Sequence, residues 1–193
     1  MKKNILTLLA VVAAAFVSVT TVNAQSQFHK GDFALNLDYG LGYFSDYDFD
    51  GNNTDNSTAQ HSVGLVGEYG ILNVIDSKGT VSVGAQFGVG FGSEGDFDLR
   101  RVRIATRGTL HYSFIPQLDT YAGLTFGIVD INKWKYEYED DNRKIKVDDT
   151  NARFVIPAIF TGVRYMVSNS FGFNSEFSWD RFATISLGVS FKF

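Results

Sequence analysis

The sequence predicts an all-β fold, a closed antiparallel up-and-down transmembrane β-barrel of about eight strands, preceded by a cleavable signal peptide. Three observations support this prediction. Apolar residues recur at every second position over long stretches after Gln25, which is the side-chain period of a strand. The positions between them hold mostly small polar residues. Aromatic residues make up 15% of the 193-residue chain, beside 19 glycines and two prolines, and this composition favours strands.

The first 24 residues have the three parts of a secretory signal peptide. Two lysines give a positively charged start, residues 5–17 are almost wholly apolar, and residues 22–24 (Val-Asn-Ala) place small side chains before a cleavage site. A membrane-spanning helix needs about 20 apolar residues, more than this stretch provides, and no charged stop follows it. We therefore expect residues 1–24 to be removed after export, which leaves residues 25–193 as one barrel domain.

The alternation divides the rest of the chain into eight runs. In residues 33–43 the odd positions are mostly large and apolar, whereas the even positions are Ala, Asn, Asp, Gly and Gly. Residues 81–91 repeat this pattern with Ser, Gly, Gln, Gly and Gly at the even positions. Two further clear runs and four weaker ones complete the set: 102–112 and 185–193, then 62–69, 120–138, 143–167 and 171–179.

The character of the second face predicts which side of each strand meets the membrane. A soluble barrel or sandwich also alternates, but its water-facing side is normally rich in Lys and Glu. Gly, Ser, Thr, Asn and Gln instead suit the crowded lumen of a narrow barrel. The apolar face is long enough to cross hydrocarbon as a tilted strand of about ten residues. Aromatic residues near the strand ends would form an interfacial girdle: Tyr43, Phe44, Tyr69, Tyr112, Tyr121, Trp134, Tyr165, Phe171 and Trp179.

The composition also excludes several classes of function. The chain has no cysteine, which excludes disulfide scaffolds, thiolate metal sites and cysteine nucleophiles. Three histidines are too few for a histidine-rich metal centre. The formal charge of −4 argues against a nucleic-acid partner, because the phosphate backbone requires a basic surface. We therefore expect no cofactor and no nucleic-acid binding.

The last strand carries a family resemblance. Ile185, Leu187, Val189, Phe191 and Phe193 alternate to the final residue, which resembles the C-terminal signal, here Phe191 and Phe193, read by the outer-membrane barrel assembly machinery. With the signal peptide and the eight runs, the whole mature chain resembles the small outer-membrane barrels typified by OmpA, OmpX and OmpW domains. Bacterial outer-membrane barrels have an even number of strands, and the eight runs of this chain agree with that rule. The resemblance implies a location in the bacterial outer membrane, contact with its lipid and a non-enzymatic structural or surface role. An OmpW-like pore or conduit for hydrophobic solutes is the alternative.

Strand counting then places the connections. If both termini face the periplasm, the outer connections are residues 45–60, 92–98, 136–151 and 180–181, and the inner turns are residues 70–79, 113–119 and 168–170. The first outer connection contains Asp46, Asp48 and Asp50 followed by glycine, which resembles the start of a calcium-binding loop. However, the position of the bidentate glutamate holds Ser57. A solvated acidic loop is therefore the alternative to a weak cation site.

Seven charged residues fall on the predicted lumen face. Charges inside a narrow barrel are costly unless they are paired, so a structural network of mixed sign is the expectation. A gated polar path for small solutes is the alternative. The seven residues are Asp38, Glu68, Arg101, Arg103, Arg107, Arg164 and Glu176.

Trp134, Tyr136 and Tyr138 alternate with charged residues before a turn at residues 140–142. This pattern predicts a hairpin that projects beyond the membrane, as in OmpX-like proteins. Its exposed edge could bind a surface ligand by adding a partner strand. An ordinary charged loop is the alternative.

His111 and Ser113 raise an enzymatic alternative. A histidine near a serine on a barrel wall resembles the dyad of outer-membrane lipid A deacylases, in which the imidazole activates the hydroxyl for acyl transfer. The sequence offers Phe114 where a polar residue is expected, and no third member of a triad is evident. We therefore expect no catalytic site.

Overall fold

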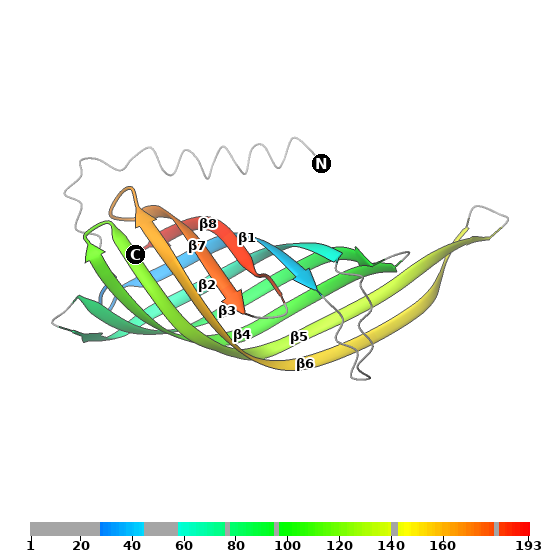
Figure 1. The fold of residues 1–193 in the computed structure, drawn as a ribbon, viewed down its shortest axis with the longest axis horizontal. Helices are drawn as coiled ribbons and strands as arrows, with labels where there is room; N and C mark the ends of the chain where they lie inside the picture. The colour runs from blue at the N-terminus through cyan, green and yellow to red at the C-terminus, as the bar shows by residue number, and fades with distance from the viewer. Residues whose placement is uncertain (1–27, 45–57, 76–77, 95–96, 140–142, 180–181) are drawn as a thin grey trace.

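The computed structural model describes residues 28–44, 58–75, 78–94, 97–139, 143–179 and 182–193. Within these ranges, eight strands form a closed barrel in which each strand pairs with its neighbour in the sequence and β8 pairs with β1 (Figure 1). Every pairing is antiparallel. The predicted fold class, an up-and-down barrel of eight strands, is confirmed. The predicted signal peptide, residues 1–24, lies outside the described residues.

The strands differ greatly in length. β7 has 9 residues and β8 has 8, whereas β5 has 22 and β6 has 24. The bounds are β1 Phe33–Phe44, β2 Thr58–Val74, β3 Gly79–Glu94, β4 Phe97–Ile115, β5 Leu118–Glu139, β6 Arg143–Met166, β7 Phe171–Trp179 and β8 Ile185–Lys192.

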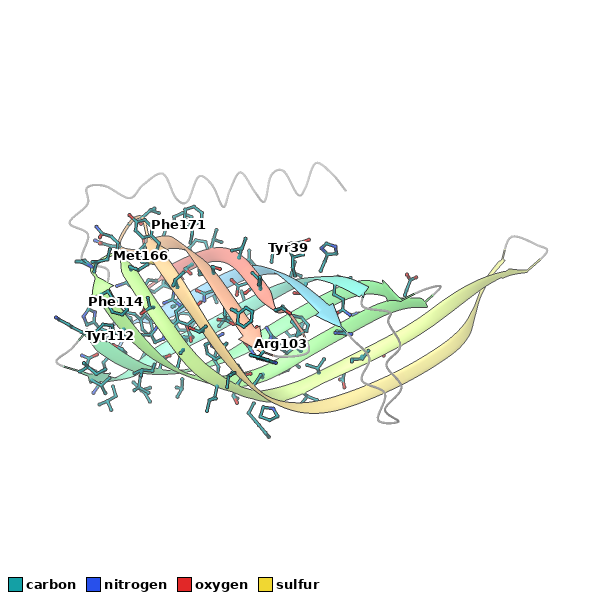
Figure 2. The ribbon with its side chains drawn as sticks, in the orientation of Figure 1. Tyr39, Arg103, Tyr112, Phe114, Met166 and Phe171 are labelled. Carbon is teal, nitrogen blue, oxygen red and sulfur yellow. The ribbon has the colours of Figure 1, made fainter. Side chains whose placement is uncertain are left out.

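The side-chain alternation has the orientation that the sequence predicts. On β1, Leu37 is 54% exposed and its neighbour Asp38 is 9% exposed. On β3, Phe87 is 47% exposed and Gln86 is 3% exposed. The large apolar side chains therefore point away from the barrel and the small polar ones fill its interior. Figure 2 shows Tyr112 pointing outward near one end of the barrel. Because the ladder is closed, the paired segments have no unpaired sheet edge. Closure suits a sheet in hydrocarbon, where unpaired backbone N–H and C=O groups are costly.

The connections are shorter than predicted in several places. β2 continues to Val74, so the predicted inner turn of residues 70–79 shrinks to residues 75–78. β4 and β5 are joined by residues 116–117 instead of 113–119. The last outer connection, predicted at residues 180–181, is in contrast longer and ends at residue 184. Because a ladder gains hydrogen bonds with each added pair, strands continue into segments whose side-chain pattern is weak. The predicted turn at 140–142 separates β5 from β6 as expected.

β5 and β6 project far beyond the other strands at the end of the barrel opposite the C-terminus, which we call the hairpin end (Figure 1). The ladder between them runs to the pair Glu139–Arg143. In contrast, the ladder between β6 and β7 ends at the pair Ile159–Trp179. Residues 143–158 of β6 therefore have no strand partner on this second edge among the described residues.

Three residues of the predicted aromatic girdle point outward, as a girdle requires, whereas Tyr121 does not. Tyr69 and Tyr165 are both about half exposed, and Trp179 is 75% exposed. Tyr121 is 3% exposed and lies inside the barrel. Its ring packs against Phe160 and His111 with centroid distances of 6.3 Å and 5.5 Å. Tyr121 is thus a core residue.

In the part of the chain that the structure describes, no helix has both the length and the apolar character needed to span a bilayer.

Candidate functional site

The lumen is filled by a charged cluster. All seven charged residues predicted on this face lie inside the barrel, and none is more than 9% exposed. They come from strands all around the barrel: Asp38 on β1, Glu68 on β2, Arg101, Arg103 and Arg107 on β4, Arg164 on β6 and Glu176 on β7.

Glu68 is the centre of this cluster. Its Oε1 lies 3.1 Å from Nε of Arg107, and its Oε2 lies 3.1 Å from Nη2 of Arg164. The hydroxyl of Thr109 donates to Oε1 over 2.6 Å. One carboxylate thus bridges two buried guanidinium groups, each of which has a second acidic partner. Such a group tolerates burial because each charge is paired and hydrogen-bonded.

Each arginine has a different second partner. Arg107 donates from Nη2 to Oε2 of Glu176 over 2.9 Å, and its guanidinium carbon lies 3.7 Å from the ring centroid of Phe160. Arg164 donates from Nη1 to Oδ2 of Asp119 over 3.1 Å. The network therefore joins β2, β4, β5, β6 and β7 across the lumen.

A chain of hydrogen bonds lines the wall beside this network. The hydroxyl of Ser190 lies 2.8 Å from the side-chain oxygen of Asn36 and 3.0 Å from that of Asn174. Asn174 donates its amide to Asp38 over 2.6 Å. These contacts link β1, β7 and β8, the strands at the closure of the barrel.

Ser82, His111 and Asp119 form a hydrogen-bonded row with the geometry of a serine-hydrolase triad. Ser82 Oγ lies 3.0 Å from Nε2 of His111, and Nδ1 of His111 lies 2.9 Å from Oδ2 of Asp119. A neutral imidazole satisfies both contacts, because Nδ1–H donates to Asp119 and Nε2 accepts from Ser82. Both ring nitrogens are thereby engaged by partners other than Ser113. The pairing of His111 with Ser113 that the enzymatic alternative requires is therefore not formed.

This row has no access for a substrate. Each of the three residues is at most 2% exposed. The ring of Phe28 lies over His111 with a centroid distance of 4.5 Å. A hydroxyl that cannot be reached cannot attack an external acyl group, whatever its hydrogen bonds.

Phe28 belongs to a short segment that covers the end of the barrel holding the C-terminus, which we call the terminal end. Its carbonyl accepts from the Thr80 hydroxyl over 2.7 Å. Gly31 donates its backbone N–H to Gly70 over 2.9 Å, and Gly70 donates back to Asp32 over 3.0 Å. Gly31 has a φ of +95°, which favours glycine. Residues 28–32 therefore form a fixed cap on this end of the lumen.

Phe182 covers the hairpin end in a similar way. It is 3% exposed, and the guanidinium carbon of Arg103 lies 4.3 Å from its ring centroid. Gly88 leaves room for this ring, because a Cβ there would stand 2.6 Å from it. The void bounded by Asp38, Arg103, Glu176 and Phe182 has about 10 Å³, roughly the space of one water molecule.

Sequence reasoning missed the aromatic residues of the lumen, Phe28, Tyr121, Phe160 and Phe182. The sequence signal that could have found two of these residues, Tyr121 and Phe160, is the glycine opposite each of them. Tyr121 is paired with Gly162, and Phe160 with Gly123. A Cβ on either glycine would approach the opposite ring to about 2.5 Å. An inward glycine directly across from a large residue therefore marks an interior aromatic side chain.

Two predicted sites lie outside the described side chains. Asp46, Asp48 and Asp50 fall outside the described residues. Trp134, Tyr136 and Tyr138 have a described backbone on β5, with Tyr136 opposite Lys146 and Tyr138 opposite Lys144. In the described residues, no group of three or more His, Cys, Asp or Glu side chains is placed to hold a metal ion.

Comparison with solved structures finds the same architecture in outer-membrane proteins. Neisserial surface protein A matches with a TM-score of 0.55 at 11% sequence identity, over 85% of this chain and 98% of that one. Ail, the attachment invasion locus protein of Yersinia pestis, matches in its complex with the heparin analogue sucrose octasulfate. The TM-score is 0.53 at 12% identity, over 85% of this chain and 99% of Ail.

This chain thus has the fold of the small eight-stranded outer-membrane β-barrels. No protein-family model matches the sequence, and a search of curated proteins finds no match.

Proposed function

We propose that the protein is a non-enzymatic barrel of the bacterial outer membrane that presents the β5–β6 hairpin to the exterior as a docking strand for an extracellular protein. The unpaired edge of β6 is the observation that carries this proposal. The membrane location is supported by the outward apolar side chains, by the fold and by the predicted signal peptide.

The hydrogen-bonding groups on this edge can be assigned by parity. Met166 donates its backbone N–H toward β5, to Gln117, whereas Val167 donates on the β7 side, to Phe171. Because the direction alternates along a strand, odd-numbered residues of β6 face the β7 side. Beyond Ile159, the free edge therefore presents the N–H and C=O groups of Asn151, Arg153 and Val155, which can pair with an added strand.

Pro157 limits how far a partner strand can extend toward the membrane. It lies two residues beyond the last β6–β7 pair, Ile159–Trp179, and it has no N–H to donate. Proline on an edge blocks pairing locally. The docking segment is consequently residues 149–156, on the hairpin side of this proline.

The charge of the hairpin favours a protein strand over a polyanion. Residues 133–149 contain five basic and six acidic side chains. Ail was crystallised with a sulfated heparin analogue, a ligand that requires a cationic surface. The mixed charge of this hairpin gives no such surface, whereas backbone pairing does not depend on net charge.

An array of ten-residue peptides with alternating apolar and polar positions tests the proposal, with the purified barrel in lipid discs as the analyte. We expect binding to a subset of the peptides. Asn151→Pro removes one outward N–H and should abolish binding, whereas Asn151→Ala keeps this donor and should preserve it. Full binding of the same peptides by Asn151→Pro would refute the docking role.

A small pore is the second candidate, and the polar lining from Asp119 to Asp38 favours it. The caps formed by Phe28 and Phe182, and the network around Glu68, oppose it because they fill the lumen. Planar bilayer recordings separate the two roles. Steady single-channel conductance by the unmodified barrel would establish the pore, and its absence supports the docking role.

A further inference from the structure

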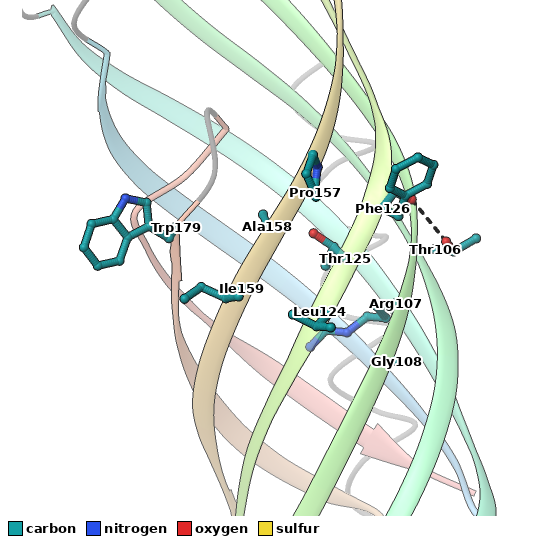
Figure 3. Close-up of a pocket in the computed structure, with 10 residues that line it drawn as sticks. All are labelled: Thr106, Arg107, Gly108, Leu124, Thr125, Phe126, Pro157, Ala158, Ile159 and Trp179. Atoms are coloured by element: carbon teal, nitrogen blue, oxygen red, sulfur yellow. Dashed lines mark hydrogen bonds between the residues drawn. The ribbon is translucent and has the colours of Figure 1, made fainter.

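The outer wall of the barrel carries a groove of about 500 Å³ (Figure 3). It crosses β4, β5 and β6 and reaches the end of β7. One side of the groove is a row of residues that stand directly opposite one another on successive strands. The row consists of Gly108, Leu124, Ile159 and Trp179.

Two features of the sequence create the groove. Gly108 points outward, and a Cβ added to it would meet no atom within 4 Å. Gly67 also lies on an outward-facing position, but there the ring of Phe33 comes within 3.3 Å of an added Cβ and fills the space. At the other end of the row, β7 stops at Trp179, so the wall has no further strand beside Pro157.

Two apolar side chains of the groove are less covered by neighbours than two outward side chains on the other side of the barrel. Leu124 is 65% exposed and Phe126 is 63% exposed. On the other side of the barrel, Leu65 is 44% exposed and Phe87 is 47% exposed. The groove is therefore a region of the apolar wall in which side chains lack lateral contacts.

The geometry points to this groove as a binding site for one acyl chain of a membrane lipid. The inference rests on the proposed membrane location and is independent of the strand-docking role. In that location hydrocarbon is the medium that meets the wall. An apolar groove left empty forfeits the dispersion contacts of its lining, and a flexible alkyl chain can follow it. The volume lies in the range of about 300–1,000 Å³ found for sites that bury small ligands.

Trp179 orients the bound lipid. It is the last residue of β7 at the hairpin end and is 75% exposed. Tryptophan side chains favour the level of the lipid headgroups. The lipid headgroup therefore lies near Trp179, and the acyl chain runs across Ile159 and Leu124 toward Gly108.

Trp179 also reports on the site, because the chain has two tryptophans and Trp134→Phe leaves it as the single one. The probe is a phosphatidylcholine with brominated acyl chains, which quenches tryptophan fluorescence on contact, titrated into the barrel in detergent micelles. The matched control is Leu41→Trp in a background of Trp134→Phe and Trp179→Phe. Leu41 also points outward near the hairpin end, opposite Ile185, the first residue of β8.

We expect quenching of Trp179 to saturate at about one lipid per barrel, as mass action predicts for a discrete site. Quenching at position 41 should rise in proportion to the lipid added and show no saturation at that ratio. Gly108→Leu places a side chain in the groove. In this variant, quenching of Trp179 should rise without saturation, as it does at position 41. Equal, unsaturated curves at both positions would overturn the inference.

Native mass spectrometry of the detergent-washed barrel provides a second readout. The unmodified barrel should retain one lipid, and Gly108→Leu should retain none; equal retention by both overturns the assignment to this groove. Reconstitution into vesicles made wholly of brominated lipid tests the membrane location separately from lipid binding in the groove. If tryptophan at positions 41 and 179 is quenched there, the location holds, whereas absence of quenching at both contradicts the location itself.

Discussion

Phe33 and Phe193 form two reciprocal backbone hydrogen bonds at the terminal end of the barrel. Phe33 N–H donates to the carbonyl of Phe193 over 3.1 Å, and Phe193 N–H donates to the carbonyl of Phe33 over 2.8 Å. Their ring centroids are 6.3 Å apart. The last residue of the chain thus closes the barrel against the first residue of β1.

This pairing assigns a structural role to the backbone of Phe193, whereas the sequence resemblance predicts a separate role of its ring in assembly. Deleting Phe193 removes both hydrogen bonds and should lower the free energy of unfolding in lipid vesicles by about 1–3 kcal/mol. Phe193→Ala keeps the backbone bonds. It should refold normally in vesicles, yet give much less surface protein in cells, because the sequence predicts that the assembly machinery reads the Phe193 ring.

Phe33→Ala is the control for the ring contact, since it leaves the C-terminal signal intact. Surface levels in cells, measured by antibody labelling, should be normal for Phe33→Ala and low for Phe193→Ala. Equal levels for the two variants would contradict a role of the terminal ring in assembly.

The central position of Glu68 predicts a large cost for removing its charge. Glu68→Gln leaves Arg107 and Arg164 with one acidic partner each and weakens their charge-assisted contacts with residue 68, which should cost about 1–3 kcal/mol. Urea unfolding in vesicles, followed by tryptophan fluorescence, measures this loss. Asp98→Asn changes the same charge at an exposed position and should stay within about 0.5 kcal/mol of the unmodified protein. A comparably small effect of Glu68→Gln would show that the network does not stabilise the barrel.

Gly88 and Gly90 provide a matched pair for the cap formed by Phe182. An added Cβ at Gly88 would stand 2.6 Å from the Phe182 ring, whereas one at Gly90 would keep an ordinary 3.6 Å from it. Gly88→Ala should therefore displace the ring and destabilise the fold by about 1–3 kcal/mol, and Gly90→Ala should have little effect on the ring.

The displacement can be followed with a single introduced thiol, because the chain has no cysteine. Ser62 lines the void beneath Phe182, so Ser62→Cys should react slowly with a water-soluble thiol reagent. Combination with Gly88→Ala should accelerate the reaction, and combination with Gly90→Ala should not. Identical rates in both combinations would show that Phe182 does not seal the lumen.

The barrel could be predicted from the sequence, because the alternation of apolar and polar residues fixes which face of each strand points inward. Each strand that buries Asn36 or Ser82 inward must expose Leu37 or Val83 outward, and a one-residue slip would reverse every side chain. The same parity placed all seven charged residues in the lumen. Which charges meet was not predictable, since the contacts of Glu68 depend on the shear between strands far apart in the chain.

The aromatic caps were missed for a different physical reason. Phe28 and Phe182 lie outside the strands, in segments where no periodicity constrains the direction of a side chain. Tyr121 was assigned to the girdle because it lies near a strand end, although its parity places it inward. For residues near the rim, the position along a strand is thus a weaker indicator of side-chain direction than the odd or even position in the alternation.

Site-directed spin labelling tests the orientation of the wall most directly. A nitroxide at Leu187→Cys or Phe87→Cys, in vesicles, should be relaxed by oxygen, which concentrates in hydrocarbon, and little by a water-soluble nickel complex. A nitroxide at Thr106→Cys, also outward, should behave in the same way. If the labels at Leu187 and Phe87 are shielded from both relaxing agents, these side chains form the core of a water-soluble body, and the account of a lipid-facing barrel is contradicted.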